Sequence, residues 1–461
     1  MPSLTQRPVP SPLPSRWRAS PLVLALGLAL AASAVQAQSL GELYEAARAY
    51  DASYQSVKAQ ADSTVYRAEQ ARALNRPQVS ATGALAYNRA ETPYSTTATM
   101  SQTHQQSIGV SAQQSLFNRG NDRAIEQSER AIELAQAQLQ SVEQDLIVRV
   151  AQAYFDVLAA TDTLGTVQAS KKAIGEQLAS AKRNFEVGTA TITDTREAQA
   201  RFDLASAQEL AARNDLDVKR LALETLVGRG GLSPRPLAVP VVLPALAPAE
   251  ADAWVGRAED AHPQLRQLRL AREIARLETE KARTGHLPTV GVSASLTEAH
   301  TRLNGQARTG AFGPLSGTGP TANVAVQLNL PLFTGYSVQN RIKETLALED
   351  KAQADLDAGR RGVAQGTRTA FFGVNSLRAQ VGALEAAESS SKLALEATQL
   401  GYKVGVRVNL DVLNAQAQLY QAQRDLAKAR YDVIVTGLKL RQAAGLLAPQ
   451  DVGAVDALLA R

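Results

Sequence analysis

The chain has 461 residues, a net charge of +5, no cysteine, 45% hydrophobic residues and 20% charged residues. The hydrophobic share excludes an intrinsically disordered chain, and the missing cysteines exclude disulfides, thiolate zinc sites, iron–sulfur clusters and a lipidated N-terminal cysteine. The small positive excess gives no indication of nucleic-acid binding.

Residues 1–37 form a predicted secretory signal peptide. Three arginines precede an apolar run over residues 22–32, and Val35-Gln36-Ala37 offers the small residues that a signal peptidase reads. The alternative, a membrane anchor, needs about 20 apolar residues, and this run is too short. Cleavage after Ala37 would leave 461 − 37 = 424 residues.

The first half of the remaining chain predicts helices around a pair of strands. A short helix is expected over about residues 40–75, and long helices over about 120–187 and 194–227. No proline lies between Pro93 and Pro234, and apolar residues in the longest segment recur at coiled-coil spacing. At 1.5 Å per residue, that helix would be about 100 Å long.

The second half repeats this layout at a nearly constant offset. Phe185-Glu186-Val187-Gly188 reappears 217 residues later as Tyr402-Lys403-Val404-Gly405, and Asp194 reappears as Asp411. Self-similarity of this kind indicates an internal duplication, with the elements of the first half expected again in the second.

The second half should therefore hold a short helix over about 251–285 and long helices over about 337–404 and 411–444. The expected domain organisation, after the signal peptide, is a first structural repeat over 38–228, a proline-rich linker over 229–251, a second structural repeat over 252–446 and a C-terminal tail over 447–461.

Each half interrupts its helices with two stretches in which apolar residues alternate with small or polar ones. These stretches cover about residues 79–87, 108–116, 290–297 and 324–330. An apolar face opposite a polar face suits a strand with lipid on one side and water on the other. Loops rich in Thr, Ser and Gly are expected within each pair, at about 90–105 and 299–321.

Four spanning strands cannot close a barrel, because bacterial outer-membrane barrels start at eight strands. Open strand edges are not tolerated in lipid, so the chain is expected to pool strands with copies of itself, two, three or four in all. Phe117 and Phe333 end strands at matching positions, where they would lie in an interfacial aromatic girdle or simply pack against the strand ends.

This layout resembles the TolC family of outer-membrane channel-tunnels. The resemblance is carried by the signal peptide, by the repeat of two strands and two long helices, and by segments 184–194 and 401–413. It implies an α+β membrane protein: a trimer in which four transmembrane β-strands per chain form a 12-stranded barrel, continued by a long coiled-coil α-helical tunnel through the periplasm. It also implies a periplasmic adaptor (membrane fusion) protein and an inner-membrane ABC or proton-driven transporter as partners, besides outer-membrane lipid.

The resemblance assigns roles to single residues. Asp194, Tyr402 and Arg407 match positions whose hydrogen bonds and salt bridges hold the tunnel closed at its periplasmic entrance. Asp411 matches a carboxylate that rings the constriction. Asn414 stands where the family often has a second aspartate, which predicts weaker cation attraction.

Two further segments match the helix tips proposed to meet the adaptor. They are Val187-Gly188-Thr189 and Val404-Gly405-Val406, and the second departs from the usual Val-Gly-Thr. That departure leaves the contact of the second tip with its partner less well defined.

Several of these residues also have purely structural interpretations. Asp194 opens the sequence Asp-Thr-Arg-Glu, a good capping box, and Asp411 suits a helix N-cap. Arg407 would then be a solvated loop charge, and Gly188 and Gly405 would supply positive φ at tight turns. Capping and gating are compatible, because a cap at the start of an inner helix can face the pore.

The sequence predicts neither an enzyme nor a cofactor. No nucleophile elbow, phosphate loop or His-Glu-x-x-His motif occurs. No histidine is paired at metal-ligand spacing, and all are interpreted as structural or solvated. They are His104, His262, His286 and His300.

The leading hypothesis is a passive export duct in a Gram-negative outer membrane, driven by its partner transporter. Type I protein secretion competes with efflux of small toxic molecules, and the missing N-terminal cysteine favours secretion. A structural coiled-coil surface protein would explain the heptads but not four amphipathic strands. The cargo, the individual pump and adaptor, and the open diameter stay undetermined.

Overall fold

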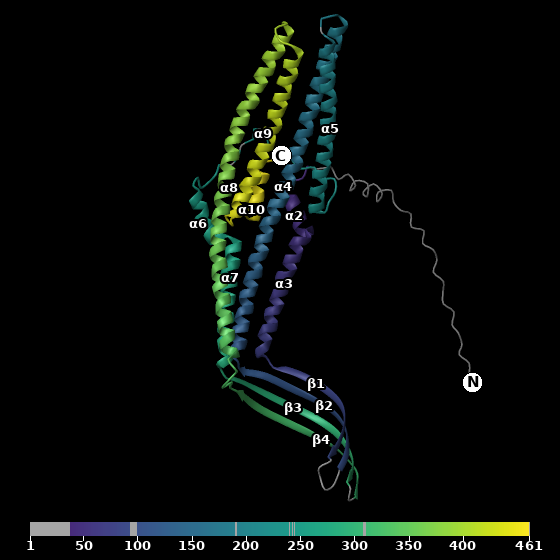
Figure 1. The fold of residues 1–461 in the computed structure, drawn as a ribbon, viewed down its shortest axis with the longest axis vertical. Helices are drawn as coiled ribbons and strands as arrows, with labels where there is room; N and C mark the ends of the chain where they lie inside the picture. Colours follow the sequence, from purple (N-terminus) through teal and green to yellow (C-terminus); the bar gives the residue numbers. More distant parts are fainter. Residues whose placement is uncertain are drawn as a thin grey trace, which may run out of the picture.

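The computed structural model describes residues 37–92, 99–189, 191–238, 240–241, 243, 245–307 and 310–460. The molecule is elongated: long helices run along one axis, and a curved sheet extends from one end of them (Figure 1). The turns that join the long helices in pairs lie at the opposite end. Apart from Ala37, the predicted signal peptide lies outside the described residues.

The chain enters the fold through two helices rather than one. α2 spans Leu40–Tyr50 and α3 spans Ala52–Arg72, followed by the 3₁₀ turn η1 at Ala73–Asn75. The predicted continuous helix over 40–75 is wrong at Asp51, whose carboxylate accepts the Tyr54 N–H at 2.8 Å and so caps α3. A residue that caps one helix leaves the helical conformation, and the axis bends there.

The long helices of the first half follow the prediction closely. α4 spans Arg119–Glu186 and α5 spans Ile192–Val227. The 68 residues of α4 make it about 100 Å long at 1.5 Å per residue. Gly228 ends α5 with φ of 74°, a left-handed conformation that glycine adopts without strain.

The second half repeats this order of elements, and here too the first predicted helix is divided in two. Pro263 starts a new helix because it has no N–H for a preceding turn, so the predicted helix over 251–285 is divided at His262. The elements are α6 at Ala251–Ala261, α7 at Pro263–Arg283, η2 at Thr284–His286, α8 at Ser337–Lys403, α9 at Asn409–Ala443 and α10 at Pro449–Asp456.

The four predicted strands form one antiparallel sheet in the order β1-β2-β3-β4. Their bounds are β1 at Gln78–Thr92, β2 at Thr99–Phe117, β3 at Thr289–Ala307 and β4 at Gly310–Asn329. They are longer than predicted, and the expected loops over 90–105 and 299–321 are wrong. Pairing continues to Thr99 opposite Ala307, because Thr and Ser are well tolerated in strands.

Two histidines assigned to surface loops therefore stand in the sheet. The His104 ring lies 4.8 Å from that of Tyr87, centroid to centroid. His300 Nδ1 lies 2.7 Å from the Thr318 hydroxyl on the neighbouring strand. Both have side-chain partners, in keeping with the structural interpretation.

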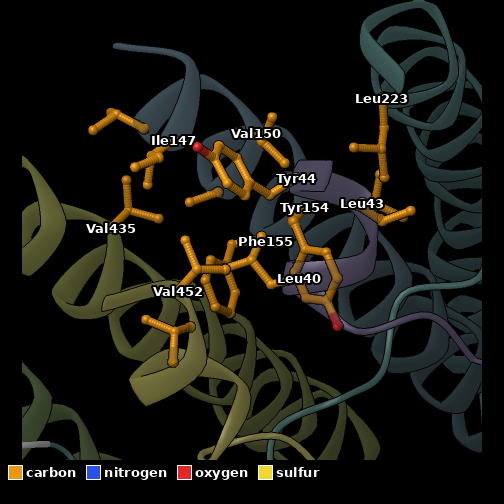
Figure 2. Packing of buried hydrophobic residues seen from close by; sticks show 14 of the residues in the cluster. Leu40, Leu43, Tyr44, Ile147, Val150, Tyr154, Phe155, Leu223, Val435 and Val452 are labelled. Atoms are coloured by element: carbon orange, nitrogen blue, oxygen red, sulfur yellow. The ribbon is translucent and has the colours of Figure 1, made fainter. Parts of the chain in front are cut away.

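The largest apolar core lies at mid-length of the helices, where α2, α4, α5, α9 and α10 meet. Tyr154 and Phe155 of α4 are almost completely buried at its centre, between Leu40 and Leu43 of α2 and Val435 and Val452 of the C-terminal helices (Figure 2). This core fixes three of the long helices, α4, α5 and α9, relative to one another.

The segment before α2, the linker and the segment after α10 meet beside that core. Gln38 pairs with Pro234 of the linker, and Leu237 of the linker pairs with Leu459. The Asp456 carboxylate accepts the N–H groups of Leu40 and Gly41, at 2.7 and 3.0 Å, and thus caps α2 from the C-terminal helix. The linker is therefore held at Pro234 by the segment before α2 and at Leu237 by the segment after α10.

Candidate functional site

The turns at the far end of the two helix pairs have the same backbone. In the first, Gly188 has φ of 79°, and the Thr189 N–H bonds to the Asn184 carbonyl at 2.8 Å. In the second, Gly405 has φ of 78°, and the Val406 N–H bonds to the Gly401 carbonyl at 2.9 Å. Both are Schellman motifs, and the predicted need for positive φ at these glycines is confirmed.

The first turn leads into a capping box that starts three residues earlier than expected, at Thr191 instead of Asp194. Thr191 is the N-cap of α5, its hydroxyl accepting the Asp194 N–H at 3.2 Å. The Asp194 carboxylate in return accepts the N–H and hydroxyl of Thr191, at 2.9 and 2.7 Å. Asp194 is thus the third residue of the helix rather than its cap, so the box predicted to start there is wrong, although a carboxylate suits this position as well.

The second turn has no side-chain cap. α9 begins at Asn409 with Val408 as its N-cap, so Asp411 is the third helical residue and not the expected cap. Asp411 Oδ2 instead lies 3.6 Å from Arg407 Nη1, and both side chains are substantially exposed. This pair replaces the capping box of the first turn with a weak, solvent-screened ion pair.

Side-chain hydrogen bonds join the α4/α5 pair to the α8/α9 pair. The Asn184 amide donates to the Tyr402 hydroxyl at 3.3 Å, and the Gln177 amide donates to the buried Asn409. Further along, Arg201 Nη2 donates to Asn414 Oδ1 at 3.1 Å. Each bond joins residues more than 200 positions apart, across the two repeats.

The three predicted entrance residues are not brought together within one chain. Tyr402 reaches across to Asn184, Arg407 pairs with Asp411 in its own turn, and Asp194 bonds within its own cap. The bonding partners Asn184, Gln177 and Arg201 were not identified from the sequence. The only available signal was that Gln177 and Asn184 are polar and seven residues apart on a coiled-coil helix.

A small apolar cluster supports this end of the helices. It consists of Ile174, Leu178, Ala181, Ala198, Ala205 and Leu413, with Phe202 against it. Lys171, the polar residue in the apolar heptad pattern of α4, lies 5.5 Å over the Phe202 ring and donates to Glu209 at 2.9 Å. That hydrogen bond is the main cause that lowers the pKa of the Glu209 carboxyl.

The outermost residues of both turns expose apolar side chains. Val187 is 73% exposed in the first turn, and Val406 is 78% exposed in the second, with Val404 and Val408 also exposed. Grouped apolar side chains that stay exposed are typical of contact surfaces. The predicted tip segments thus lie at the extreme end of the molecule (Figure 1).

Within the described residues, no helix carries an apolar stretch long enough to cross a membrane. In that same part of the chain, His, Asp and Glu side chains form no group that could hold a metal ion.

A family model described as outer membrane efflux protein matches residues 43–229 and 254–446. Outer membrane protein TolC of Vibrio cholerae serotype O1 is 33% identical over 443 residues, which cover 95% of this chain and 97% of that protein. Alkaline protease secretion protein AprF of Pseudomonas aeruginosa is 35% identical over 332 residues, covering 70% of this chain and 66% of that protein. Among solved structures, the outer membrane protein VceC of Vibrio cholerae shares the fold with a TM-score of 0.71 at 19% identity, covering 88% of this chain and 96% of that one.

Proposed function

The chain belongs to the outer membrane efflux protein family, and from that premise we propose that it is the outer-membrane duct of a type I protein-secretion system. Family and relatives make it a channel of the Gram-negative outer membrane and not an enzyme. The observation that carries the secretion proposal is the 35% identity to a relative named for alkaline protease secretion.

Three copies of the chain would complete the duct. In one chain β1 and β4 are the two edges of the sheet, and an open edge is not tolerated in lipid. Pairing β4 of each copy with β1 of the next would join three four-stranded sheets into a closed 12-stranded barrel. The long helices would then continue as a tunnel on the periplasmic side, which their length of about 100 Å supports.

The tip end of the helices would form the closed entrance of that tunnel. We assign Asp194, Tyr402 and Arg407 to the bonds that hold it shut. Arg407 has a 61% exposed side chain, and Asp194 bonds only through its Oδ2 atom in the described contacts, so both keep capacity for a neighbouring copy. Asp411 and Asn414 would line the constriction, with Arg407 screening part of the Asp411 charge.

The exposed tips would dock to the periplasmic adaptor. The residues assigned to docking are Val187, Gly188, Thr189, Val404, Gly405 and Val406. An ABC or proton-driven transporter in the inner membrane would supply the energy. Burial of the exposed valines would stabilise the contact, at about 1.5–3 kcal/mol for each fully buried side chain.

Efflux of small toxic molecules is the second candidate. It is favoured by the description of the family itself, which names efflux. Both functions use the same duct, since the partner transporter selects the cargo. A structural surface protein, the third class considered, does not fit membership of a channel family.

Deleting the gene separates the two candidates. The secreted proteins and the sensitivity to detergents, bile salts and dyes are compared with those of the complemented strain. Loss of one secreted polypeptide with unchanged sensitivity is expected. Broad hypersensitivity with normal secretion would replace the secretion proposal with efflux, and loss of both would mean that several pumps share the channel.

Complementation with variants tests docking in the same strain. Val406→Asp places a charge in the proposed contact and should abolish export while the trimer still assembles. Val218→Asp is the matched control, because Val218 of α5 is also exposed, at 54%, but lies away from the tips. Equal export by the two variants would remove the second tip from the adaptor contact.

A further inference from the structure

One face of the sheet carries a band of apolar side chains that spans all four strands. Residues opposite each other on antiparallel strands share a face, so the register defines successive rows across the sheet. One row contains Val79, Ala112, Ala294 and Val324, and the next contains Ala81, Val110, Leu296 and Ala322. Val79, Val110, Leu296 and Val324 are all exposed in the single chain.

Over the same stretch of the strands, the opposite face is small and polar. Its rows contain Ser80, Ser111, Ser295 and Asn323, then Thr82, Gly109, Thr297 and Thr321. The apolar face is therefore the one that would meet lipid, and the inference that follows rests on the proposed barrel.

Further from the helices, beyond the apolar band, the same face carries a row of different chemistry. Tyr87, His104 and Arg302 are consecutive partners across β1, β2 and β3 on the apolar face, and all three are exposed. The Tyr87 and His104 rings touch, with centroids 4.8 Å apart. His300 lies on the same face one row closer to the helices.

The spacing of this row matches a bilayer. Along β3 it lies 302 − 290 = 12 residues from Val290, which faces the same way near the helices. At about 3.3 Å per residue and a tilt of about 40°, that distance is about 30 Å along the membrane normal. The row would thus reach the far interface of the membrane, the one that faces the exterior.

The two ends of the band differ in charge. Near the helices, the guanidinium carbon of Arg119 lies 5.7 Å from the centre of the Phe117 ring. The Arg119 guanidinium also forms an ion pair with the Asp122 carboxylate at 3.4 Å. At the far end, no described carboxylate lies within 4 Å of the Arg302 guanidinium. In the described contacts, Arg119 at the inner end therefore has a carboxylate partner, whereas Arg302 at the outer end has none.

The carboxylate-bearing residue Glu298 also lies on this face, opposite Ile108 and Pro320. A charge within the hydrocarbon is costly, so this carboxylate is a polar exception on the lipid-facing side of β3. Arg302 lies two rows beyond it, about 13 Å along the strand at 3.3 Å per residue. With increasing distance from the helices, this face of β3 thus presents apolar side chains, then the carboxylate of Glu298, the imidazole of His300 and the guanidinium of Arg302.

We infer that the row of Tyr87, His104 and Arg302 binds the phosphate groups of an acylated, phosphorylated glycolipid in the outer leaflet. The guanidinium of Arg302 matches a phosphate in charge and in hydrogen-bond geometry. The imidazole and phenol add further hydrogen-bond donors, and the apolar band below receives the acyl chains. Three copies of the row would surround the barrel with sites for such a lipid.

The test measures lipid retained by the assembled protein in phosphatidylcholine nanodiscs containing a small share of diphosphoryl lipid A. Arg302→Gln should lower the amount of lipid A that copurifies about fivefold at low salt, as expected for one basic residue at an anionic surface. Arg302→Lys should keep most of it. Arg119→Gln, the matched control at the other end of the band, should leave retention unchanged.

Two results would overturn the inference: equal retention by Arg302→Gln and the parent protein, or an equal loss with Arg119→Gln. Single-channel conductance of the same samples distinguishes this failure from that of the proposed duct. Normal channels with unaffected lipid A retention would reject only the lipid site. The absence of channels in the parent protein would reject the duct itself.

Discussion

The two helical turns at the tip of the molecule share one backbone but differ in side-chain chemistry. Gly188 and Gly405 have φ of 79° and 78°, and each turn closes the preceding helix with the same pair of hydrogen bonds. The first turn then starts its next helix with a reciprocal capping box, and the second starts it with a valine that caps nothing. Duplication thus preserved the geometry while the chemistry diverged.

The difference between the two turns predicts which helix pair opens more readily. α5 is held at its start by Thr191 and Asp194, whereas α9 is held there by the exposed pair of Arg407 with Asp411. A cap contributes about 1 kcal/mol, and an exposed ion pair contributes less. We therefore expect the second pair, α8 and α9, to open more readily than the first.

The largest effect is expected from removal of the proposed entrance bonds. Asp194→Ala combined with Arg407→Ala should raise single-channel conductance several-fold, because the bonds assigned to closure are lost. Planar-bilayer recording provides the measurement. Thr191→Ala is the matched control, since it removes the cap of α5 and leaves the Asp194 carboxylate in place. Unchanged conductance in the double variant would remove both residues from the gate.

Gly188→Ala and Gly405→Ala test whether the backbones are equivalent. A Cβ at either position meets no atom within 4 Å, so the cost is only that of a left-handed residue, about 1–2 kcal/mol. Hydrogen exchange of the flanking helix ends should increase by a similar factor in both variants. A large difference between the two would mean that one turn is supported by contacts the other lacks.

Exchanging the caps should bring the two turns closer in stability. Thr191→Ala should destabilise the start of α5 by about 1 kcal/mol, and Val408→Thr should stabilise the start of α9 by a similar amount. Amide exchange over the first turn of each helix measures both effects. An increase in protection of α5 in Thr191→Ala would contradict the capping geometry.

The smallest expected effect concerns ion selectivity. Asp411→Asn should lower the preference for cations and weaken block by divalent ions, because it removes one carboxylate per chain from the proposed ring. Arg407→Gln should act in the opposite direction, since it unmasks the Asp411 charge 3.6 Å away. Reversal potentials in a salt gradient measure both. Equal selectivity in all three proteins would place Asp411 off the pore.

Much of the fold could be predicted because its signals are local. Proline-free heptads defined α4 and α8 to within a residue or two at each end, and alternation placed all four strands. The matching glycines located both turns. Their left-handed conformation is a property of the residue and its immediate neighbours, so a short segment contains the information.

The errors lie where a local pattern had more than one solution. Thr- and Ser-rich segments were taken for loops, but backbone pairing across the sheet extends β2 and β3 through them. Asp194 and Asp411 both suited the N-cap position, but α5 and α9 begin two residues before them, at Ile192 and Asn409. Strand pairing decided the first case and the conformation of Thr191 and Val408 decided the second.

The sequence alone thus determined the lengths of the long helices, the internal duplication, the strand faces and the two glycine turns. Tertiary structure alone decided the ends of the strands, the breaks at Asp51 and His262, and the partners of polar side chains such as Asn184 with Tyr402. The physical reason is distance along the chain. A helix or turn depends on residues within a few positions, whereas a hydrogen bond between groups 218 residues apart exists only once both helix pairs have packed.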